Sequence, residues 1–418
     1  MTRPRGVVVV TGSELVRGER ADRNGPFLAG ELLRLGIEPA RIEIVGDDPG
    51  ELEAALREGL GADLCAVSGG LGPTHDDRTV ELLARATGRE LVVDAALEAE
   101  IEAISRGVAE RLRRPYADFA EGVRKQATLP ASALVVGIAG TAPALVLDSG
   151  RTVFVVLPGP PSELQRLWPE ALETEPVRAV LARAREPERR VLRFYGASES
   201  AVALALAEAG GEADGLAATV CARDFEIHVD LVFEPEAAGE AERLSAGLRQ
   251  RVGSYLFAQD ERPVEELVLA ACREGGLSLA AAESCTGGLV AARLTSVPGS
   301  SDVFCGGVVA YADGVKRAEL GVAEELLERH GAVSPEVAAS MAAGARGRLE
   351  ADVAVAVTGI AGPGGGTPDK PVGLVYLHAE GPAGGVAQEL NLPGDRAAVR
   401  GRATAAALHL VRTLLAQS

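Results

Sequence analysis

The chain contains very little lysine. Of its 42 basic residues (Lys plus Arg), only Lys125, Lys316 and Lys370 are lysines, and the other 39 are arginines. A solvated surface cation can be either residue, but an ammonium can lose its proton in a desolvated site and act as a base, which a guanidinium cannot do. Codon bias can produce the same imbalance, so the three lysine positions point to chemistry without proving it.

Cysteine is scarce as well. The five cysteines are an odd number, are widely spaced and form no CxxC pair, which is typical of reduced thiols and argues against a disulfide framework or a zinc site. No apolar run reaches the roughly 20 residues that a membrane span needs, and residues 1–6 lead into a strand without a signal-peptide core. These absences predict a cytoplasmic protein with no membrane partner.

Positive charge is in deficit. The chain has 60 acidic and 42 basic residues and a formal net charge of -18. This balance argues against direct nucleic-acid binding, which depends on cations that replace counterions, but small anionic ligands need only a local positive pocket. With 47% hydrophobic residues the chain is expected to fold, and 418 residues are too many for one ordinary core, so two or three domains are expected.

The pattern of apolar residues predicts two α/β domains with a smaller module between them. Strands and amphipathic helices alternate over residues 1–168 and again over residues 264–418, which is typical of a parallel sheet with helices on both faces. Residues 169–252 read as strand, helix, two strands and helix, and are expected to form a small α+β (KH-like) module, followed by a linker over residues 253–263. The expected fold class is therefore α/β, with two three-layer α/β domains joined by a small α+β module.

The first segment with chemical character is Ser-Gly-Gly-Leu-Gly-Pro-Thr-His-Asp-Asp, which follows an expected strand that ends at residue 68. Its glycines, Gly69, Gly70 and Gly72, allow a ligand to approach the backbone, and the amides of such a turn favour a phosphate. Asp76 and Asp77 supply the oxygen atoms that a divalent metal of the Mg²⁺ type prefers. Phosphate-binding amides beside a carboxylate pair suit the hydrolysis of a phosphoanhydride. The alternative interpretation is a Gly-Pro turn whose aspartate caps the next helix.

A series of motifs in residues 11–164 resembles the N-terminal, molybdopterin-binding-like domain of the CinA family (competence/damage-inducible protein A). The motifs are Thr11–Leu15, Asn24, Val45–Asp48, Gly69–Asp77, Arg124–Ala127, Gly140–Pro143 and Leu157–Leu164, in family order. The resemblance implies a pyrophosphatase that depends on a divalent metal (Mg²⁺ or Co²⁺ type) and cleaves ADP-ribose to AMP and ribose 5-phosphate. Ser13 and Ala144 depart from the family pattern, and both are expected to alter details of the substrate pocket.

The resemblance also implies roles for single residues. Glu14 and Asp47 would join Asp76 and Asp77 around the metal and the phosphates. The remaining substrate-binding residues would be Gly69, Gly70, Gly72, Thr74, Asn24, which shapes the pocket, and Lys125, which faces a phosphate.

Ser284 is the candidate nucleophile of the C-terminal half. It lies between an expected strand and an expected helix over residues 287–294, so its hydroxyl would lie near helix-start amides that stabilise an oxyanion. None of the five histidines lies in a motif-like place in this half, whereas Lys316 can act as the base if it is desolvated. Tyr311, at the end of the expected strand 303–311, can relay or hold the proton.

Two other interpretations of this segment stay open. Cys285 is a rival nucleophile, because a thiolate at a helix start would also be activated. In the interpretation without chemistry, Ser284 caps the helix and Lys316 is a surface lysine.

A glycine-rich loop, residues 358–370, follows the expected strand 353–357. Gly359, Gly364 and Gly365 within it suit a nucleotide phosphate or another close approach to the backbone. The alternative is a flexible surface loop. Lys370 closes the loop and is either a phosphate contact or an accident of sequence.

These C-terminal segments resemble the C-terminal CinA domain, whose members deamidate nicotinamide mononucleotide (NMN). The resemblance implies that Ser284 attacks the carboxamide carbon, that Lys316 and Tyr311 manage the proton, and that water then releases nicotinate mononucleotide. Thr358 and Arg396 would bind the substrate, the arginine through its phosphate. No metal or other cofactor is expected for this domain.

The resemblance of both halves therefore implies a bifunctional enzyme of pyridine-nucleotide salvage, with NMN and ADP-ribose as small-molecule partners, and a homodimer is expected. The alternative is a protein whose first domain binds a pterin or nucleotide without turnover, in a competence or DNA-damage context. The middle module is expected to be a spacer or a dimerisation element.

Overall fold

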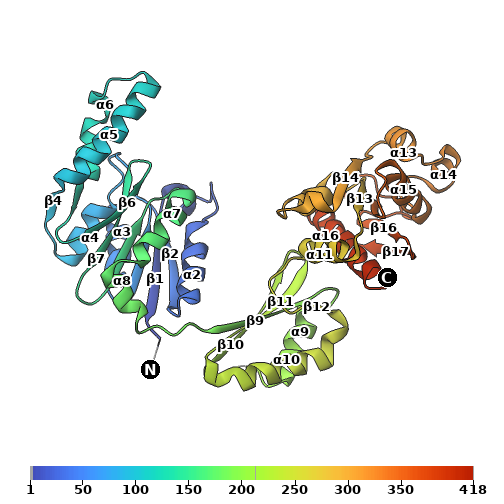
Figure 1. Ribbon diagram of the computed structural model, residues 1–418, viewed down its shortest axis with the longest axis horizontal. Coiled ribbons are helices and arrows are strands. Elements are labelled where there is room, and N and C mark those ends of the chain that lie inside the picture. Colours follow the sequence, from blue (N-terminus) through green and yellow to red (C-terminus); the bar gives the residue numbers. More distant parts are fainter. Residues whose placement is uncertain (1–2, 212, 418) are drawn as a thin grey trace. The chain divides into compact units, whose positions relative to one another are not determined.

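The computed structural model describes residues 3–211 and 213–417, which divide into two compact units, Met1–Glu188 and Arg189–Ser418 (Figure 1). The fold is α/β, as predicted. Within the described residues, no helix has the length and apolar character needed to cross a membrane.

The first unit is built on a six-stranded sheet in the order β2-β1-β3-β8-β7-β6. Strands β2, β1, β3 and β8 run parallel, and β7 and β6 are antiparallel additions at one edge. The strands are β1 (Arg5–Thr11), β2 (Glu38–Val45), β3 (Leu64–Ser68), β6 (Leu134–Ala139), β7 (Ala142–Asp148) and β8 (Val153–Leu157), with a separate pair, β4 (Leu91–Val93) and β5 (Thr128–Pro130). The helices are α1 (Ser13–Val16), α2 (Asn24–Arg34), α3 (Pro49–Gly59), α4 (Thr79–Thr87), α5 (Ala95–Leu112), α6 (Ala117–Gln126), α7 (Pro161–Leu172) and α8 (Glu175–Leu181).

Alternate residues of strand β1 show the three layers of this unit. Val7 and Val9 pack into a core with α3, α4 and α5, whereas Val8 and Val10 pack into a second core with α2, α7 and α8. Because successive side chains of a strand point to opposite faces, helices cover both faces of the sheet.

The expected end of the first domain at residue 168 is too early. Trp168 lies inside helix α7, where it is buried and its indole Nε1 donates to Glu31 Oε2 of α2 at 3.0 Å. Helix α8 packs on the same face of the sheet. The unit therefore continues to Glu188.

The second unit begins with the small module, whose sheet has the order β10-β11-β9-β12. Its elements are β9 (Glu188–Phe194), α9 (Glu199–Glu208), β10 (Leu216–Arg223), β11 (Glu226–Phe233), η1 (Pro235–Ala237), α10 (Ala238–Val252), η2 (Gly253–Tyr255) and β12 (Leu256–Ala258). The predicted order of one strand, a helix, two strands and a second helix is present as β9, α9, β10, β11 and α10. The expected linker over residues 253–263 is shorter than predicted, because β12 pairs with β9 as an edge strand of the module.

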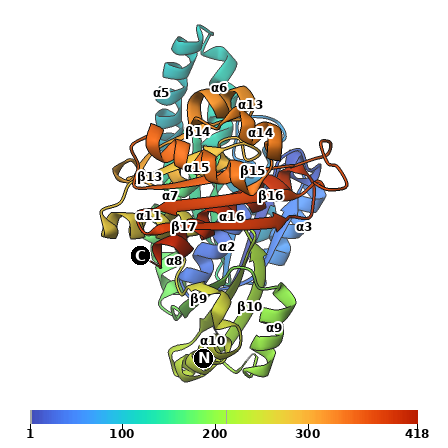
Figure 2. The ribbon, with the colours of Figure 1, turned by 90° about the vertical axis from the view of Figure 1, so that its right-hand side faces the viewer.

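The C-terminal part of the second unit has a five-stranded sheet in the order β14-β13-β15-β16-β17. The first three strands are parallel, and β16 and β17 form an antiparallel pair that lies side by side in Figure 2. The strands are β13 (Leu279–Glu283), β14 (Phe304–Val309), β15 (Val353–Gly359), β16 (Leu374–Gly381) and β17 (Gly384–Asn391). The helices are α11 (Val264–Gly275), α12 (Leu289–Thr295), η3 (Ser300–Asp302), α13 (Asp313–Leu320), α14 (Glu324–His330), α15 (Pro335–Arg348) and α16 (Arg396–Leu415).

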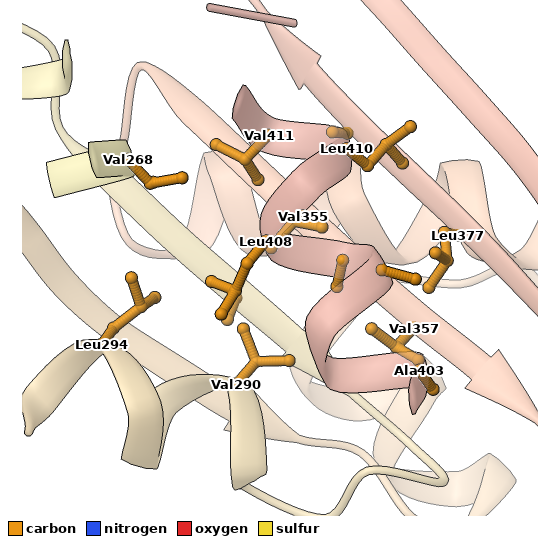
Figure 3. Packing of buried hydrophobic residues seen from close by; sticks show 14 of the residues in the cluster. Val268, Val290, Leu294, Val355, Val357, Leu377, Ala403, Leu408, Leu410 and Val411 are labelled. Atoms are coloured by element: carbon orange, nitrogen blue, oxygen red, sulfur yellow. The ribbon is translucent and has the colours of Figure 1, made fainter. Parts of the chain in front are cut away.

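Helix α16 is the centre of the larger C-terminal core. Figure 3 shows Ala403, Leu408 and Val411 of this helix packed among side chains of β15, β16, α11 and α12. The opposite face of the sheet carries alanines such as Ala280 and Ala354, against which α15 packs. This part of the chain is therefore also three-layered.

A buried charge cluster joins the small module to α16. Glu226, at the start of β11, is 1% exposed and accepts hydrogen bonds from Arg193 Nη2 at 2.8 Å and His409 Nε2 of α16 at 2.9 Å. Burial alone would raise the pKa of Glu226, but hydrogen bonds from His228 and His409 and the charges of His409 and Arg193 outweigh it and lower the pKa to about 2. Glu226 is therefore ionised at neutral pH.

Glu226→Gln should destabilise the second unit strongly at pH 7. The substitution leaves Arg193 buried without its counter-charge, which typically costs about 3–5 kcal/mol. Because the folded pKa of about 2 is below the ordinary value of 4.5, this contribution is complete above pH 4.5 and is lost as the pH falls toward 2. Urea unfolding of the parent and of Glu226→Gln between pH 7 and pH 3 measures the difference between their unfolding free energies.

The control for this variant is Glu208→Gln, which removes an exposed ion pair with Arg251 at 2.9 Å. Exposed pairs contribute about 0–1 kcal/mol, so the control should unfold nearly as the parent does. Equal unfolding free energies for Glu226→Gln and Glu208→Gln at pH 7 would contradict the role of the cluster.

Candidate active sites

A cavity of about 270 Å³ in the C-terminal domain brings together every site residue that the sequence predicted for this half. It lies where strands β13 and β15 end, and the loops that follow them form its walls. The predicted residues that line it are Ser284, Tyr311, Lys316, Thr358, Gly359, Gly364, Gly365 and Arg396.

Ser284 directly follows strand β13 and extends its pairing by one residue. Its amide donates to Val357 O of β15 at 2.9 Å, and the residue is 8% exposed. Helix α12 begins only at Leu289, with Gly288 as its N-cap residue. The interpretation of Ser284 as a helix cap is therefore wrong.

The amides at the start of α12 do not face the serine, as the sequence had suggested. The buried carboxylate of Glu283 accepts them, from Gly288 N at 2.9 Å, Val290 N at 3.1 Å and Ala291 N at 2.9 Å. A carboxylate at a helix N-terminus is stabilised by the free amides and by the helix dipole. Glu283 thus holds the loop after Ser284 in place, and the expectation of an oxyanion site at this helix start is wrong.

Lys316 is enclosed, although it lies on a short helix near the surface. It is 1% exposed, and its Nζ donates to Tyr311 O at 3.3 Å and lies 3.4 Å from Asp313 Oδ1. The interpretation of Lys316 as a surface lysine is therefore wrong. A lysine amine that is removed from water in this way is the kind that serves as a proton acceptor in enzymes.

Tyr311 and Arg396 close one side of the cavity together. Strand β14 ends at Val309, so Tyr311 lies beyond the strand rather than at its end, and its side chain is exposed. Its hydroxyl accepts from Arg396 Nη2 at 2.8 Å, and Arg396 Nη1 donates to Gly362 O at 2.8 Å. The guanidinium therefore spans from the glycine-rich loop to Tyr311.

The glycine-rich loop is fixed at both ends. Thr358 Oγ1 donates to Ala332 O at 2.7 Å, and Lys370 Nζ donates to His330 O and Val333 O, each at 2.6 Å. These bonds argue against a flexible loop. They also give Lys370 a structural role, since its ammonium group is engaged by two main-chain carbonyls.

Cys285 is a weak rival for the nucleophile. The side chain is buried beside Ser284, and burial raises the pKa of its thiol to about 11. A thiol with this pKa is protonated at neutral pH and is a poor nucleophile.

Arg400 supports the loop that follows Ser284 (the serine loop), and it was not identified from the sequence. Its Nε donates to Cys285 O at 3.1 Å and its Nη2 to Thr286 O at 2.7 Å. The signal that could have revealed it is its spacing from Arg396, because residues four apart lie on the same face of a helix.

The glycine turn of the first unit lines a cavity of about 260 Å³ that contains Gly70, Gly72, Asp77 and Lys125. Gly70 has φ +66, and a side chain there would collide with Thr79 Oγ1 of α4. The packing of the turn against α4 therefore explains this glycine without a ligand.

Asp76 and Asp77 do not cap helix α4, whose N-cap residue is Arg78 and which has no side-chain cap. Instead Thr74 donates to Asp77 Oδ2 from its amide at 3.0 Å and from its hydroxyl at 2.5 Å, and the hydroxyl also contacts Asp76 Oδ1. The hydrogen bond from Thr74 lowers the pKa of Asp76. The capping interpretation is therefore wrong, and the exposed Asp76 and the half-buried Asp77 both contact Thr74.

Helix α6 holds the glycine turn from the other side. Lys125 Nζ donates to Thr74 O, and Gln126 Nε2 donates to Leu71 O at 2.9 Å. Gln126 was part of a predicted motif but was not identified as a site residue.

The four predicted metal residues are not brought together. Within residues 3–211 and 213–417, no group of three or more His, Cys, Asp or Glu side chains is placed to hold a metal ion. Asp47 accepts from Ser13 Oγ at 2.5 Å, and Glu14 lines a separate cavity of about 680 Å³. The pair Asp76 and Asp77 still fits a Mg²⁺-type ion, because such ions are commonly held by one or two carboxylates together with substrate phosphates.

Asn24 also lines the larger cavity, but its side chain is buried and engaged. Its Nδ2 donates to Ser68 Oγ at 2.9 Å and to Gly159 O at 2.7 Å. Asn24 therefore shapes the pocket by joining the end of β3 to the loop after β8.

Comparison with known proteins gives consistent matches along the whole chain. Residues 261–415 match the family model "CinA C-terminal domain", and residues 7–177 match "Probable molybdopterin binding domain". The chain is 46% identical over 429 residues to a CinA-like protein of Mycolicibacterium paratuberculosis and 44% identical over 425 residues to one of Mycobacterium tuberculosis. These alignments cover 98% of this chain and 98% and 97% of the two relatives.

A solved structure, the competence/damage inducible protein CihA from Agrobacterium tumefaciens, is similar to part of the chain. It is 42% identical, covers 38% of this chain and 99% of its own chain, and has a TM-score of 0.36.

Proposed function

Because the chain belongs to the CinA family, we propose that it is a bifunctional hydrolase of pyridine nucleotides. The C-terminal domain would convert NMN to nicotinate mononucleotide and ammonia, and the N-terminal domain would cleave ADP-ribose to AMP and ribose 5-phosphate. The observation that carries the proposal is the enclosure of Ser284 and Lys316 in one cavity with Arg396.

The amidase step uses groups of this chain alone. Ser284 Oγ attacks the carboxamide carbon, and its proton passes to Lys316 Nζ and then to the departing ammonia. Water hydrolyses the resulting ester, which releases the nicotinate product and restores the serine. Arg396 pairs with the substrate phosphate through donors that its present hydrogen bonds leave free.

The pyrophosphatase step would depend on a divalent metal that neutralises phosphate charge and activates water when bound. Asp76 and Asp77 would hold it, with Thr74 fixing their carboxylates. The amides of Gly70 and Gly72 would face the phosphates, and Lys125 would add positive charge at the rim of the same cavity.

A second candidate for the first domain is nucleotide or pterin binding without turnover. The separation of Glu14 and Asp47 from the aspartate pair favours it, since it leaves two carboxylates for a metal. Incubation of ADP-ribose with the protein and Mg²⁺ or Co²⁺ distinguishes the two candidates, because AMP appears only if the domain is an enzyme.

Asp77→Asn should reduce AMP formation from ADP-ribose by about 100-fold or more, because an amide is a poor ligand for a Mg²⁺-type ion and carries no charge. Chromatography of the nucleotides measures it, and ammonia release from NMN by the same preparation should be unchanged. The exposed Asp118→Asn on α6 is the matched control. Full AMP formation by Asp77→Asn would remove this residue from the proposed site.

A further inference from the structure

We propose that the small module positions the C-terminal active site through the tip of its β10–β11 hairpin, residues 224 and 225, which docks on helix α16. The catalytic readout of this proposal rests on the proposed NMN deamidase. The docking itself is independent of that activity. The module would then be a positioning element of the amidase rather than a spacer.

The hairpin tip has an unusual backbone. Arg223 pairs with Glu226, and the two residues between them, Asp224 and Phe225, have φ values of 52° and 67°. Two-residue hairpin turns use this left-handed conformation, but they normally use Asn, Asp or Gly for it. A bulky residue at positive φ is a true outlier and persists only where its surroundings hold it.

Helix α16 contacts the Phe225 ring on one side, while 43% of the residue remains exposed. A Cβ atom at Gly401 would lie 2.5 Å from Phe225 Cε2, so the ring reaches this part of the helix only because residue 401 is glycine. The Arg402 guanidinium lies 5.5 Å from the centre of the Phe225 ring, within the range of a cation–π contact. Arg402 Nη1 also donates to Pro393 O at 2.9 Å, in the segment that leads into α16.

The buried cluster holds the next residue of the hairpin to the same helix. Glu226 bonds His409, whose ring stacks on Tyr195 of the module with centroids 3.7 Å apart and planes at 9°. The edge contact of Phe257 with His409, at 4.6 Å, adds a third side chain from the module. The module therefore contacts α16 at two places, near residue 401 and at residue 409.

The docked part of α16 also serves the active site. Arg396, in the first turn, contacts Tyr311 and the glycine-rich loop, and Arg400, one turn later, holds the carbonyls of Cys285 and Thr286. Gly401 and Arg402 come directly after Arg400. Because a helix moves as a rigid element, a shift of this segment would move the phosphate-binding arginine and the serine loop together.

Two variants test the proposal. Phe225→Ala removes the docked ring, and Gly401→Ala places a methyl group where the ring lies, although alanine raises helix propensity. Both should raise the KM for NMN roughly 10-fold with a smaller change in kcat, because a misplaced Arg396 weakens substrate binding. Leu204→Ala, at an exposed apolar position on α9 of the same module, is the matched control.

Hydrogen exchange gives a readout that needs no activity. Amides of residues 284–288 and 396–402 should exchange faster in Phe225→Ala and Gly401→Ala than in the parent, and at the parental rate in Leu204→Ala. Exchange and KM values equal to those of Leu204→Ala would overturn the proposal. If the parent protein shows no deamidase activity, the proposed function fails, and the exchange rates alone decide whether the hairpin holds α16.

Discussion

Ser284→Ala should lower ammonia release from NMN by about 10⁴-fold or more, because loss of a nucleophile that acts together with its base removes nearly all of the chemical acceleration. Cys285 cannot replace it readily, since burial raises the pKa of that thiol to about 11. The assay follows ammonia and nicotinate mononucleotide in parallel. AMP formation from ADP-ribose should be unchanged.

Ser296→Ala is the matched control. This exposed serine lies at the end of α12, and its hydroxyl donates to the nearby main-chain carbonyl of Arg293. If Ser284→Ala deamidates NMN at the parental rate, Cys285 becomes the candidate nucleophile in place of Ser284. The double variant with Cys285→Ala would then lose the activity that the single variant kept.

Lys316→Arg should lower the deamidase activity by about 10²–10⁴-fold in kcat, the usual contribution of a general acid–base group. A guanidinium cannot accept the serine proton at any pH at which the protein is folded. The 1% exposure of Lys316 also leaves little room for a longer side chain, so Lys316→Met should be made beside it to separate loss of chemistry from poor fit.

The reverse exchange on the same helix, Arg317→Lys, is the control for this experiment. Arg317 pairs with Glu324 at 2.5 Å on the protein surface, and a lysine there should cost little. Substantial deamidation by both Lys316 variants would exclude this lysine as the proton acceptor.

The C-terminal site was predictable because of where its residues fall along the strands. Ser284 follows β13, Tyr311 follows β14 and Thr358 lies near the end of β15, and these three strands are parallel neighbours. The carboxyl ends of parallel strands meet at one edge of a sheet, where ligands of α/β folds bind. A sequence that alternates strands and helices therefore contains enough information to place these residues together.

The residues that hold the site could not be placed in the same way. Arg400 acts on a loop 115 residues earlier in the chain, and Lys370 acts on carbonyls 37 and 40 residues earlier. Such contacts depend on how helices pack on the sheet, which periodicity does not specify. For the same reason, a local motif was enough to identify the pair Asp76 and Asp77. The structure does not confirm the expected gathering of Glu14 and Asp47 around this pair.

The position of α16 in the chain has a consequence for biosynthesis. This helix follows every other element of its domain, and it supplies the centre of the core as well as Arg396 and Arg400. On the ribosome, the first unit can fold as soon as it emerges, since domains generally fold in order of synthesis. The loop that follows Ser284, in contrast, cannot be held in place until α16 has been synthesised. The two proposed activities would therefore be acquired one after the other during translation.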